Sequence, residues 1–150
     1  GVDVKGDRLW AGSTLSIEEG ITNTAFLRAQ IQTIEGFFAK DEVDNIWITF
    51  PDPRPRDRDI KRRLTSPRYL EQYKTLLKKD GWVYFKTDNH GLFEYTLELL
   101  GEREDTRDLE HTFDLYESNL AAEHHGIQTT FERRYLAQGI KINYLKFRFS

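Results

Sequence analysis

Apolar and polar side chains alternate along the chain with two periods, and this pattern predicts strands that alternate with helices. Residues 45–50, NIWITF, are a continuous run of strand-forming side chains, which is typical of a strand buried on both faces. Residues 69–77 instead place apolar side chains at helical spacing, after a Ser-Pro pair at 66–67 that fits a capped helix start. We expect this helical segment to close at Gly81.

The same two periods extend over the rest of the chain. Strands are expected at residues 1–4, 24–29, 82–88, 112–118 and 140–150, and helices at residues 8–19, 31–38, 92–100 and 129–139. Strands that alternate with helices of about ten residues indicate an α/β fold, with a mostly parallel sheet and helices on both faces. A length of 150 residues fits one domain with one core.

Three of the expected strands end in an aspartate: Asp3 in GVD, Asp52 in FPD and Asp88 in KTD. Ligands of open α/β sheets bind beyond the carboxyl ends of the strands, so three carboxylates at one edge indicate a binding site. Asp3 is placed to accept hydrogen bonds from both hydroxyls of a ribose. It fits a turn aspartate equally well, because no glycine-rich loop precedes it.

Asp52 lies between two prolines, which restrict the backbone on both sides and make the turn rigid. Rigidity suits a side chain that must hold a planar base in one orientation. A carboxylate can accept hydrogen bonds from N1–H and N2–H of guanine, and N7 on the opposite edge is then left free. Methylation of N7 needs no general base, only alignment and a negative environment for the cationic product. A purely structural turn is the alternative.

A basic loop at residues 54–63 follows this aspartate. Residues 51–68 contain seven basic and three acidic side chains, a net charge of +4 in a chain whose total is −3. Long cations on a loop match what phosphate contacts require, and Lys61, Arg62 and Arg63 are the densest group. The alternative is a solvated loop whose arginines pair with its own acids.

Composition excludes several classes of protein. The chain has no cysteine, so disulfides and thiolate zinc sites are excluded. No apolar run approaches the length of a membrane span and no signal peptide is visible, so we expect a cytoplasmic protein without a membrane partner. Glu123, His124 and His125 do not have the spacing of a helical pair of ligands and lack an evident third ligand, so we expect a loop here and no metal.

Several motifs in one order carry a resemblance to a known family. They are GVDVKGDRLW, EEGITNTAFLRA, VDNIWITFPDP, KRRLTSPRYL, FKTDNHGLFEYTLELL and TTFERRYLAQG. Together they resemble the bacterial tRNA (guanine-N7-)-methyltransferases, from residue 1 to about residue 149. The resemblance implies a Rossmann-like class I methyltransferase fold. It also implies S-adenosylmethionine as cofactor and a guanosine in the variable loop of tRNA as substrate.

The resemblance also implies roles for individual residues. Asp52 matches the catalytic acid at the end of the family's fourth strand, where it also lies against the cofactor. Asp3 matches the acid that holds the cofactor ribose, and Gln30 stands where many relatives carry an acid near the adenine. The residues that match substrate-binding positions are Arg56, Asp88 and the four-residue motif Thr129, Thr130, Phe131 and Glu132.

The chain departs from the family pattern at three places. Arg54 and Arg56 replace the tryptophan and lysine that usually follow PDP, and Gln30 replaces an acid. The family's first strand and glycine-rich cofactor loop lie upstream of residue 1, so we expect residues 1–150 to be a single methyltransferase domain that is incomplete at its N-terminus. Two alternatives stay open at this point: a non-catalytic tRNA-binding module, and a methyltransferase that acts on another nucleobase.

Overall fold

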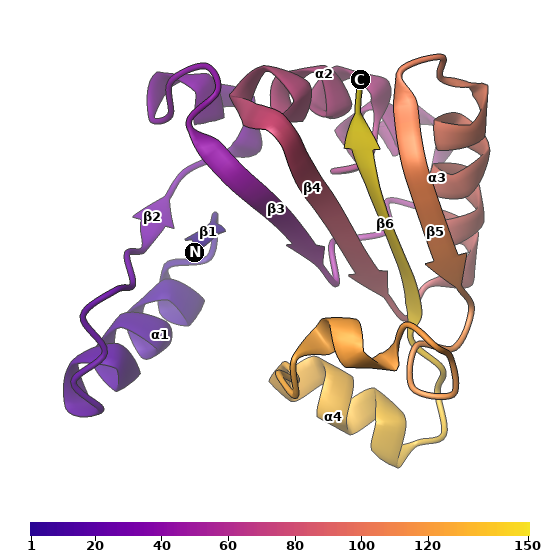
Figure 1. Ribbon diagram of the computed structural model, residues 1–150. Coiled ribbons are helices and arrows are strands. Elements are labelled where there is room, and N and C mark those ends of the chain that lie inside the picture. Colours follow the sequence, from indigo (N-terminus) through magenta and orange to yellow (C-terminus); the bar gives the residue numbers. More distant parts are fainter. The chain divides into compact units, whose positions relative to one another are not determined.

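The computed structural model describes all residues from 1 to 150 (Figure 1). The elements in chain order are β1 (Val2–Asp3), α1 (Gly6–Glu18), β2 (Leu27–Arg28), the 3-10 helix η1 (Ile31–Gly36), β3 (Val43–Thr49), the 3-10 helix η2 (Asp57–Arg62), α2 (Pro67–Leu76), β4 (Leu77–Thr87), α3 (His90–Glu102), β5 (Thr106–Thr112), the 3-10 helix η3 (Ala121–His124), α4 (Thr130–Ala137) and β6 (Asn143–Phe149). They form two compact units, residues 1–38 and residues 39–150. None of the helices has both the length and the apolar character that crossing a membrane requires.

The first unit is one strand–helix–strand motif. Strands β1 and β2 pair in parallel, with Val2 opposite Leu27 and Asp3 opposite Arg28, and α1 is the crossover between them. Helix α1 is followed by Gly20 at a φ of +67°, a left-handed conformation that glycine adopts without steric cost. The expected helix at 8–19 and its glycine stop are therefore confirmed, with a start two residues earlier than expected.

The second unit contains a four-stranded sheet in the order β3-β4-β6-β5. Strands β3 and β4 are parallel, whereas β6 is antiparallel to both of its neighbours, so β5 runs in the same direction as β3 and β4. The sheet is thus mixed rather than mostly parallel. The physical reason is that the chain leaves α4 at the end of the sheet where β4 stops, and β6 must run back from there: Asn143 at its start pairs with Thr87.

The main core of this unit lies between one face of the sheet and helices α2 and α3. Successive side chains of a strand point to opposite faces, and Val83 and Phe85 of β4 are fully buried on this one. The ring of Phe85 stacks on Phe93 of α3, with 6.1 Å between centroids. Leu70 of α2 is also fully buried, which confirms the expected apolar face of this helix.

A second apolar cluster covers part of the opposite face. It is centred on Leu115, Leu120, Ile142 and Tyr144, and the partly buried side chains of Tyr84 from β4 and of Tyr135 and Leu136 from α4 pack against it. Helices therefore lie on both faces of the sheet, as expected, although α4 covers only the end at which β3 and β4 stop (Figure 1).

Gly81 does not end a helix. Helix α2 stops at Leu76, and Leu77 already pairs with Val43 of β3, so β4 begins without a loop. A Cβ atom on Gly81 would lie 2.7 Å from the carbonyl oxygen of Asp44. This position therefore requires a glycine because the backbone of the neighbouring strand comes too close for a side chain.

The strand expected at 112–118 lies earlier, at 106–112. Its sequence, TRDLEHT, is polar because β5 is an edge strand with much of its surface exposed, so a search for apolar runs passes over it. The apolar stretch that follows forms a turn, and this turn buries Leu115 in the second cluster.

Candidate nucleic-acid interface and active site

The candidate site of the second unit lies at the carboxyl edge of the sheet, where β3 and β4 both stop. Because these strands are parallel and Thr49 pairs with Lys86, the segments that follow them begin side by side. Asp52 follows β3 and Asp88 follows β4. Helix α4 lies at the same edge (Figure 1), since the strand to which it leads begins there. The expectation that three carboxylates lie at one edge of a sheet is confirmed for Asp52 and Asp88, whereas Asp3 ends a strand of the separate two-stranded sheet β1-β2.

The turn that carries Asp52, residues 50–54, has an unusual backbone. Phe50 and Arg54 adopt left-handed conformations with φ of +49° and +46°, which are uncommon for residues other than glycine and are strained for a bulky side chain. Such strain persists only where surrounding contacts fix the segment, and it concentrates at functional sites. One contact is the Phe50 N–H, which donates to the carbonyl of Lys86 at 2.8 Å.

The carboxylate of Asp52 is open to solvent, with 62% of its side chain exposed. Its Oδ1 accepts a hydrogen bond from the Arg54 N–H at 3.2 Å, and its Oδ2 lies 3.1 Å from the Arg54 Nε. The only side chain that pairs with it is thus one that lies on the surface two residues away. A ligand can reach this carboxylate without the removal of any buried group.

Arg63 fixes the other end of the Asp52 turn. Its Nε donates to the carbonyls of Pro53 and Arg54 at 3.2 and 3.3 Å, and its Nη2 donates to Arg54 at 3.2 Å. Its guanidinium group also lies over the ring of Tyr95 in α3, 4.4 Å from the centroid. Arg63 therefore braces the turn through Nε and Nη2, and its predicted phosphate contact stays a prediction that would compete with these hydrogen bonds.

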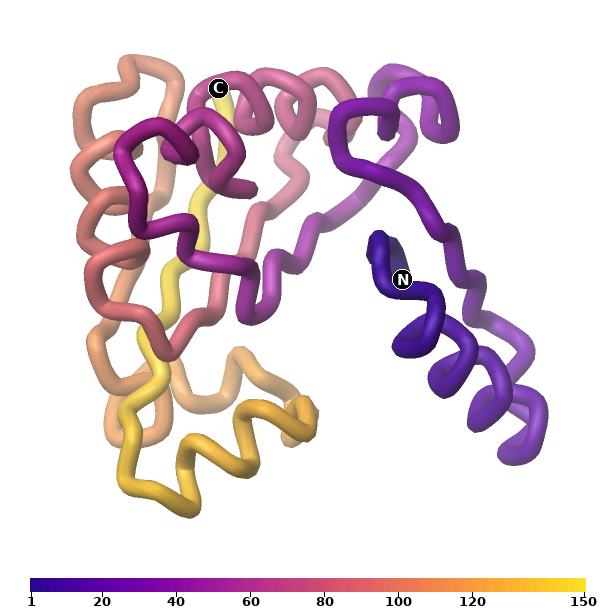
Figure 2. Tube along the Cα trace, turned by 180° about the vertical axis from the view of Figure 1, so that it is seen from behind, coloured from indigo at the N-terminus to yellow at the C-terminus, as the bar shows by residue number.

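The rest of the basic loop is more open. Figure 2 shows the segment between β3 and α2 on the same side of the sheet as α3, and Thr65 holds it there through a 2.8 Å hydrogen bond to Thr96. Arg62 makes one exposed ion pair with Asp59 at 3.4 Å. Arg56 and Lys61 are exposed and pair with no acidic side chain. The acids of the loop therefore pair with only some of its basic side chains, and the others stay open to a ligand.

Asp88 is a second available carboxylate. It is half-buried at the end of β4 and makes no hydrogen bond or ion pair. The cap of the next helix is instead its neighbour Asn89, whose Oδ1 accepts from the Leu92 N–H at 2.8 Å. Asp88 therefore does not serve as a helix cap, the commonest structural role of an aspartate at this point.

Glu132 has the opposite environment. Its side chain is 0% exposed, and the Lys86 ammonium group donates to both of its carboxylate oxygens at 2.9 Å. The Tyr116 hydroxyl donates to Oε1 at 2.8 Å, and the Thr129 N–H donates to Oε2 at 3.2 Å. Burial and the hydrogen bond to Glu132 raise the pKa of Tyr116 to about 12, so this phenol stays protonated and keeps its donor at neutral pH.

The four-residue motif at the start of α4 divides into two pairs. Thr129 and Glu132 form a capping box, in which the Thr129 hydroxyl accepts from the Glu132 N–H at 3.1 Å. Thr130 and Phe131 are exposed, and the guanidinium of Arg134 lies 5.9 Å from the Phe131 ring centroid. Of the motif, only Thr130 and Phe131 present their side chains to solvent.

The two cofactor residues predicted in the first unit lie beyond adjacent parallel strands. Asp3 ends β1, where its Oδ1 accepts from the Lys5 N–H at 2.9 Å and its Oδ2 lies 3.5 Å from Arg8. Gln30 follows β2 and is exposed at the start of η1. Both are thus at the carboxyl edge of their own strand pair, and a carboxylate with an exposed amide fits a ribose diol and an adenine edge.

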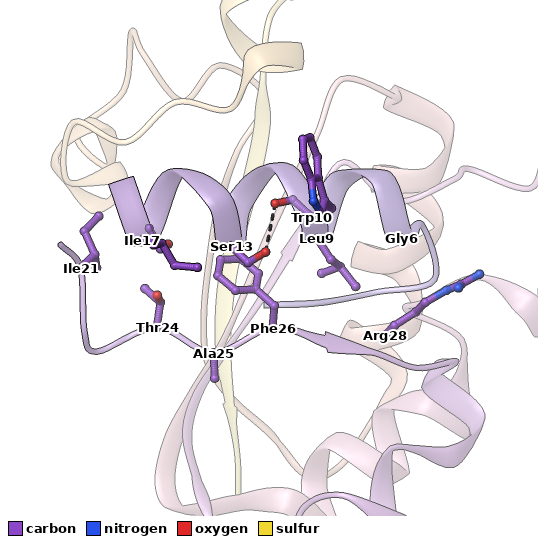
Figure 3. Close-up of a pocket in the computed structure, with 11 residues that line it drawn as sticks. Gly6, Leu9, Trp10, Ser13, Ile17, Ile21, Thr24, Ala25, Phe26 and Arg28 are labelled. Carbon is purple, nitrogen blue, oxygen red and sulfur yellow. Dashed lines mark hydrogen bonds between the residues drawn. The ribbon is translucent and has the colours of Figure 1, made fainter. Parts of the chain in front are cut away.

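A cavity of about 460 Å³ also lies in the first unit (Figure 3). It is lined by α1 and by the segment at residues 21–28, and its walls are mainly apolar, with Leu9, Ile17 and Phe26 among them. Neither Asp3 nor Gln30, the two predicted cofactor residues of this unit, lines it. We therefore do not assign it to the cofactor.

Glu123 and His124 are held by protein contacts. Glu123 accepts from Lys146 at 2.7 Å, and the His124 ring packs against Tyr116 with 5.0 Å between centroids. No group of three or more potential ligands in the chain is placed to hold a metal ion.

The sequence motifs do not identify Lys86 as part of the site. A lysine inside the strand sequence WVYFKTD was a signal, because a charge in a buried strand requires a partner. The partner lies 46 residues away in the sequence, so the pattern could not identify it.

The sequence matches known methyltransferases over its whole length. A protein-family profile described as "Putative methyltransferase" matches residues 1–145. A tRNA (guanine-N(7)-)-methyltransferase of Cytophaga hutchinsonii is 55% identical over 150 residues, which cover 99% of this chain and 68% of that protein. The chain belongs to the tRNA (guanine-N7-)-methyltransferase family. The resemblance seen in its motifs is thereby confirmed.

Other members of the family are more distant or longer. The enzyme of that name from Christiangramia forsetii is 44% identical and the one from Bacteroides thetaiotaomicron is 42% identical. The chain covers 66% of the first and 57% of the second, so it spans about three fifths to two thirds of the length of these family members.

Solved structures confirm the fold of the family. An rRNA methylase from Streptococcus thermophilus superposes with a TM-score of 0.63 at 11% identity, over 99% of this chain and 70% of that one. A methyltransferase homolog from Pyrococcus horikoshii gives a TM-score of 0.60 at 19% identity, over 98% of this chain and 52% of that one. The expected Rossmann-like class I methyltransferase fold is therefore correct, and S-adenosylmethionine is the cofactor that this family implies.

Proposed function

We propose that this protein methylates N7 of a guanosine in the variable loop of tRNA, with S-adenosylmethionine as methyl donor. The observation that carries the proposal is the exposed carboxylate of Asp52, held on a strained turn at the carboxyl edge of the sheet. The names of the most similar relatives favour the same reaction. A pure binding module would have little use for an open acid in such a constrained position.

Recognition of the base rests on Asp52. Its two oxygens can accept from N1–H and N2–H of guanine, an arrangement that distinguishes guanine from the other bases. The lone pair of N7 then points away from the carboxylate. Because N7 carries no proton, the chain needs to provide no general base, and its task is to orient the base and to stabilise the cationic product. Asp88 contributes a second negative charge at the same edge of the sheet as Asp52.

The cofactor would be held by Asp3 through its ribose and by Gln30 through its adenine. When bound, S-adenosylmethionine supplies the electrophilic methyl group. These two residues orient the donor and exclude other poses, and they take no part in proton transfer.

The tRNA backbone would be held by the open cations of the basic loop. Arg56 and Lys61 are the residues placed to do this, and Arg62 can join them by giving up a weak exposed ion pair. Phosphate contacts of this kind position an RNA and carry no sequence information. Selection of the guanine thus rests on a different side chain from those that hold the backbone.

The test compares Asp52→Asn with Asp57→Asn in the complete natural polypeptide that carries this sequence. Asp57 is an exposed aspartate of the same loop and is the matched control. Methyl incorporation into tRNA is measured, and the product is digested to identify the methylated nucleoside. We expect Asp52→Asn to lower kcat/KM by at least about a hundredfold, because an amide cannot accept from both guanine donors. Asp57→Asn should match the parent.

Three results would overturn the proposal. Near-parental N7 methylation by Asp52→Asn would remove Asp52 from its role. Salt-dependent binding of tRNA by the parent without methyl incorporation would instead favour a non-catalytic binding module. Methylation of another atom or base would point to a different nucleobase as substrate.

A further inference from the structure

Lys86 connects two parts of the site that are far apart in the sequence. Its main-chain carbonyl accepts from the Phe50 N–H of the Asp52 turn at 2.8 Å, and the ammonium group of its side chain donates to Glu132 at the start of α4. We propose that Lys86 is a positioning residue that fixes the Asp52 turn and the start of α4 relative to each other, and that Glu132 is its counter-ion and not a direct ligand of the guanine. This inference rests on the proposed function.

The hydrogen-bonding capacity of the Glu132 carboxylate is already used within the protein. A carboxylate has about four acceptor positions. Here Oε1 accepts from Lys86 and Tyr116, and Oε2 accepts from Lys86 and from the Thr129 N–H. The group is also fully buried. A guanine could reach it only after a buried ion pair was broken and a lysine was left without a partner in the core.

The side chain of Lys86 is only 4% exposed, so its charge has been removed from water and requires compensation. Glu132 provides this compensation, and the ring of Trp47 lies 5.9 Å from the ammonium nitrogen. A buried charge held by one carboxylate has a single stable position. Buried polar groups of this kind specify geometry more than they add stability.

The Asp52 turn and α4 also touch directly. The ring of Phe50 packs against Tyr135 of α4, with 6.0 Å between centroids. Phe50 has a left-handed backbone, which persists only under outside constraint. The hydrogen bond to Lys86 and the contact with Tyr135 supply this constraint from two sides. Loss of the Lys86 side chain would therefore free the start of α4 and weaken the contact of Tyr135 with Phe50, while the main-chain hydrogen bond between Phe50 and Lys86 would stay.

The test uses Lys86→Met, Glu132→Gln and the double variant, again in the complete natural polypeptide. Lys146→Met is the matched control. Lys146 lies on the neighbouring strand β6 and also pairs with an acid, Glu123, at 2.7 Å. For each variant kcat and KM for tRNA are measured separately. Hydrogen exchange is followed at residues 50–54 and 129–137.

We expect Lys86→Met and Glu132→Gln to lower kcat by similar factors, on the order of a hundredfold, with KM little changed, because the aspartate is misplaced while the cations still hold the RNA. The double variant should be no worse than either single variant, since both remove one interaction. Exchange should rise at both segments in Lys86→Met. Lys146→Met should leave kcat and both segments as in the parent.

The inference is overturned if Glu132→Gln raises KM for tRNA strongly while Lys86→Met keeps parental kinetics, which would make Glu132 a direct ligand. If Lys86→Met does not fold, the double variant decides, because it leaves no buried charge without a partner. A folded and inactive double variant supports the inference, and a folded and active one refutes it.

If the parent does not methylate tRNA, the proposed function fails separately. Exchange then decides about Lys86, and an unchanged turn at 50–54 in Lys86→Met refutes its role.

Discussion

Asp52 and Glu132 are both acids at the carboxyl edge of the sheet, and the sequence assigned both to the target guanine. In the structure they differ completely: the side chain of Asp52 is 62% exposed, whereas that of Glu132 is 0% exposed and accepts four hydrogen bonds. Asp52 has the availability of a ligand-binding group, and Glu132 has the environment of a framework group. Two carboxylates that the family motifs both assign to the substrate can thus have different functions. The burial and the hydrogen-bond partners of each carboxylate determine its function.

The largest expected effect separates these two acids by stability. Glu132→Ala should lower the free energy of unfolding by about 3–5 kcal/mol, because it leaves the Lys86 ammonium buried without a partner. Asp52→Ala should change it by no more than about 0.5 kcal/mol, as is usual for exposed positions. Chemical denaturation of both variants measures the difference. Equal losses of unfolding free energy in the two variants would mean that the buried pair of Glu132 with Lys86 does not stabilise the fold.

The same contrast exists among the arginines of the basic loop. Arg63 donates to two backbone carbonyls, so Arg63→Ala should cost about 1–2 kcal/mol of stability and leave the salt dependence of tRNA binding unchanged. Arg56→Ala and Lys61→Ala should leave stability unchanged and should each reduce the slope of log K against log salt by about 1.

Binding titrations at several salt concentrations, together with unfolding curves, test both statements. A reduced salt slope in Arg63→Ala at parental stability would show that this arginine contacts a phosphate. It would then have to leave the carbonyls that it holds in the free protein.

The smallest expected effect concerns a surface ion-pair network away from the site. Asp105 accepts from Arg103 at 2.9 and 2.8 Å and from Lys74 at 2.8 Å. Burial alone would raise the pKa of Asp105, but the hydrogen bonds and charges of Arg103 and Lys74 outweigh it and lower this pKa. A lowered pKa in the folded state contributes stability above the ordinary aspartate pKa, and this contribution is lost as the pH falls through the lowered value.

Asp105→Asn should therefore reduce the free energy of unfolding by about 1 kcal/mol at neutral pH, and the difference from the parent should shrink as the pH falls below the ordinary pKa of an aspartate. Asp44→Asn is the control, since its exposed pair with Lys78 should contribute almost nothing. A loss in Asp105→Asn that is constant with pH would show that the carboxylate charge is not responsible.

Local pattern was sufficient to place Asp52 and Asp88. The runs at residues 45–50 and 82–87 are strongly apolar, so both strands could be predicted, and parallel pairing then brings their ends together. The polar edge strand β5 could not be found in this way, because an exposed strand needs few apolar side chains. Gly81 was misread because a helix stop and a close approach of two strands require the same residue.

Residue type alone could not separate the exposed acid from the buried one. The family motif names Glu132, but its burial depends on Lys86 and Tyr116, which lie 46 and 16 residues away in the sequence. Arg63 was grouped with Lys61 and Arg62 for the same reason. Its role follows from the backbone of the Asp52 turn, which the sequence does not encode as a pattern.

Methyl transfer to tRNA by the parent and by Asp52→Asn, with nucleoside analysis of the product and an unfolding curve for each protein, decides whether Asp52 orients the guanine. We expect the parent to form 7-methylguanosine and Asp52→Asn to form almost none at unchanged stability. Parental amounts of 7-methylguanosine from a fully folded Asp52→Asn would contradict this role of Asp52.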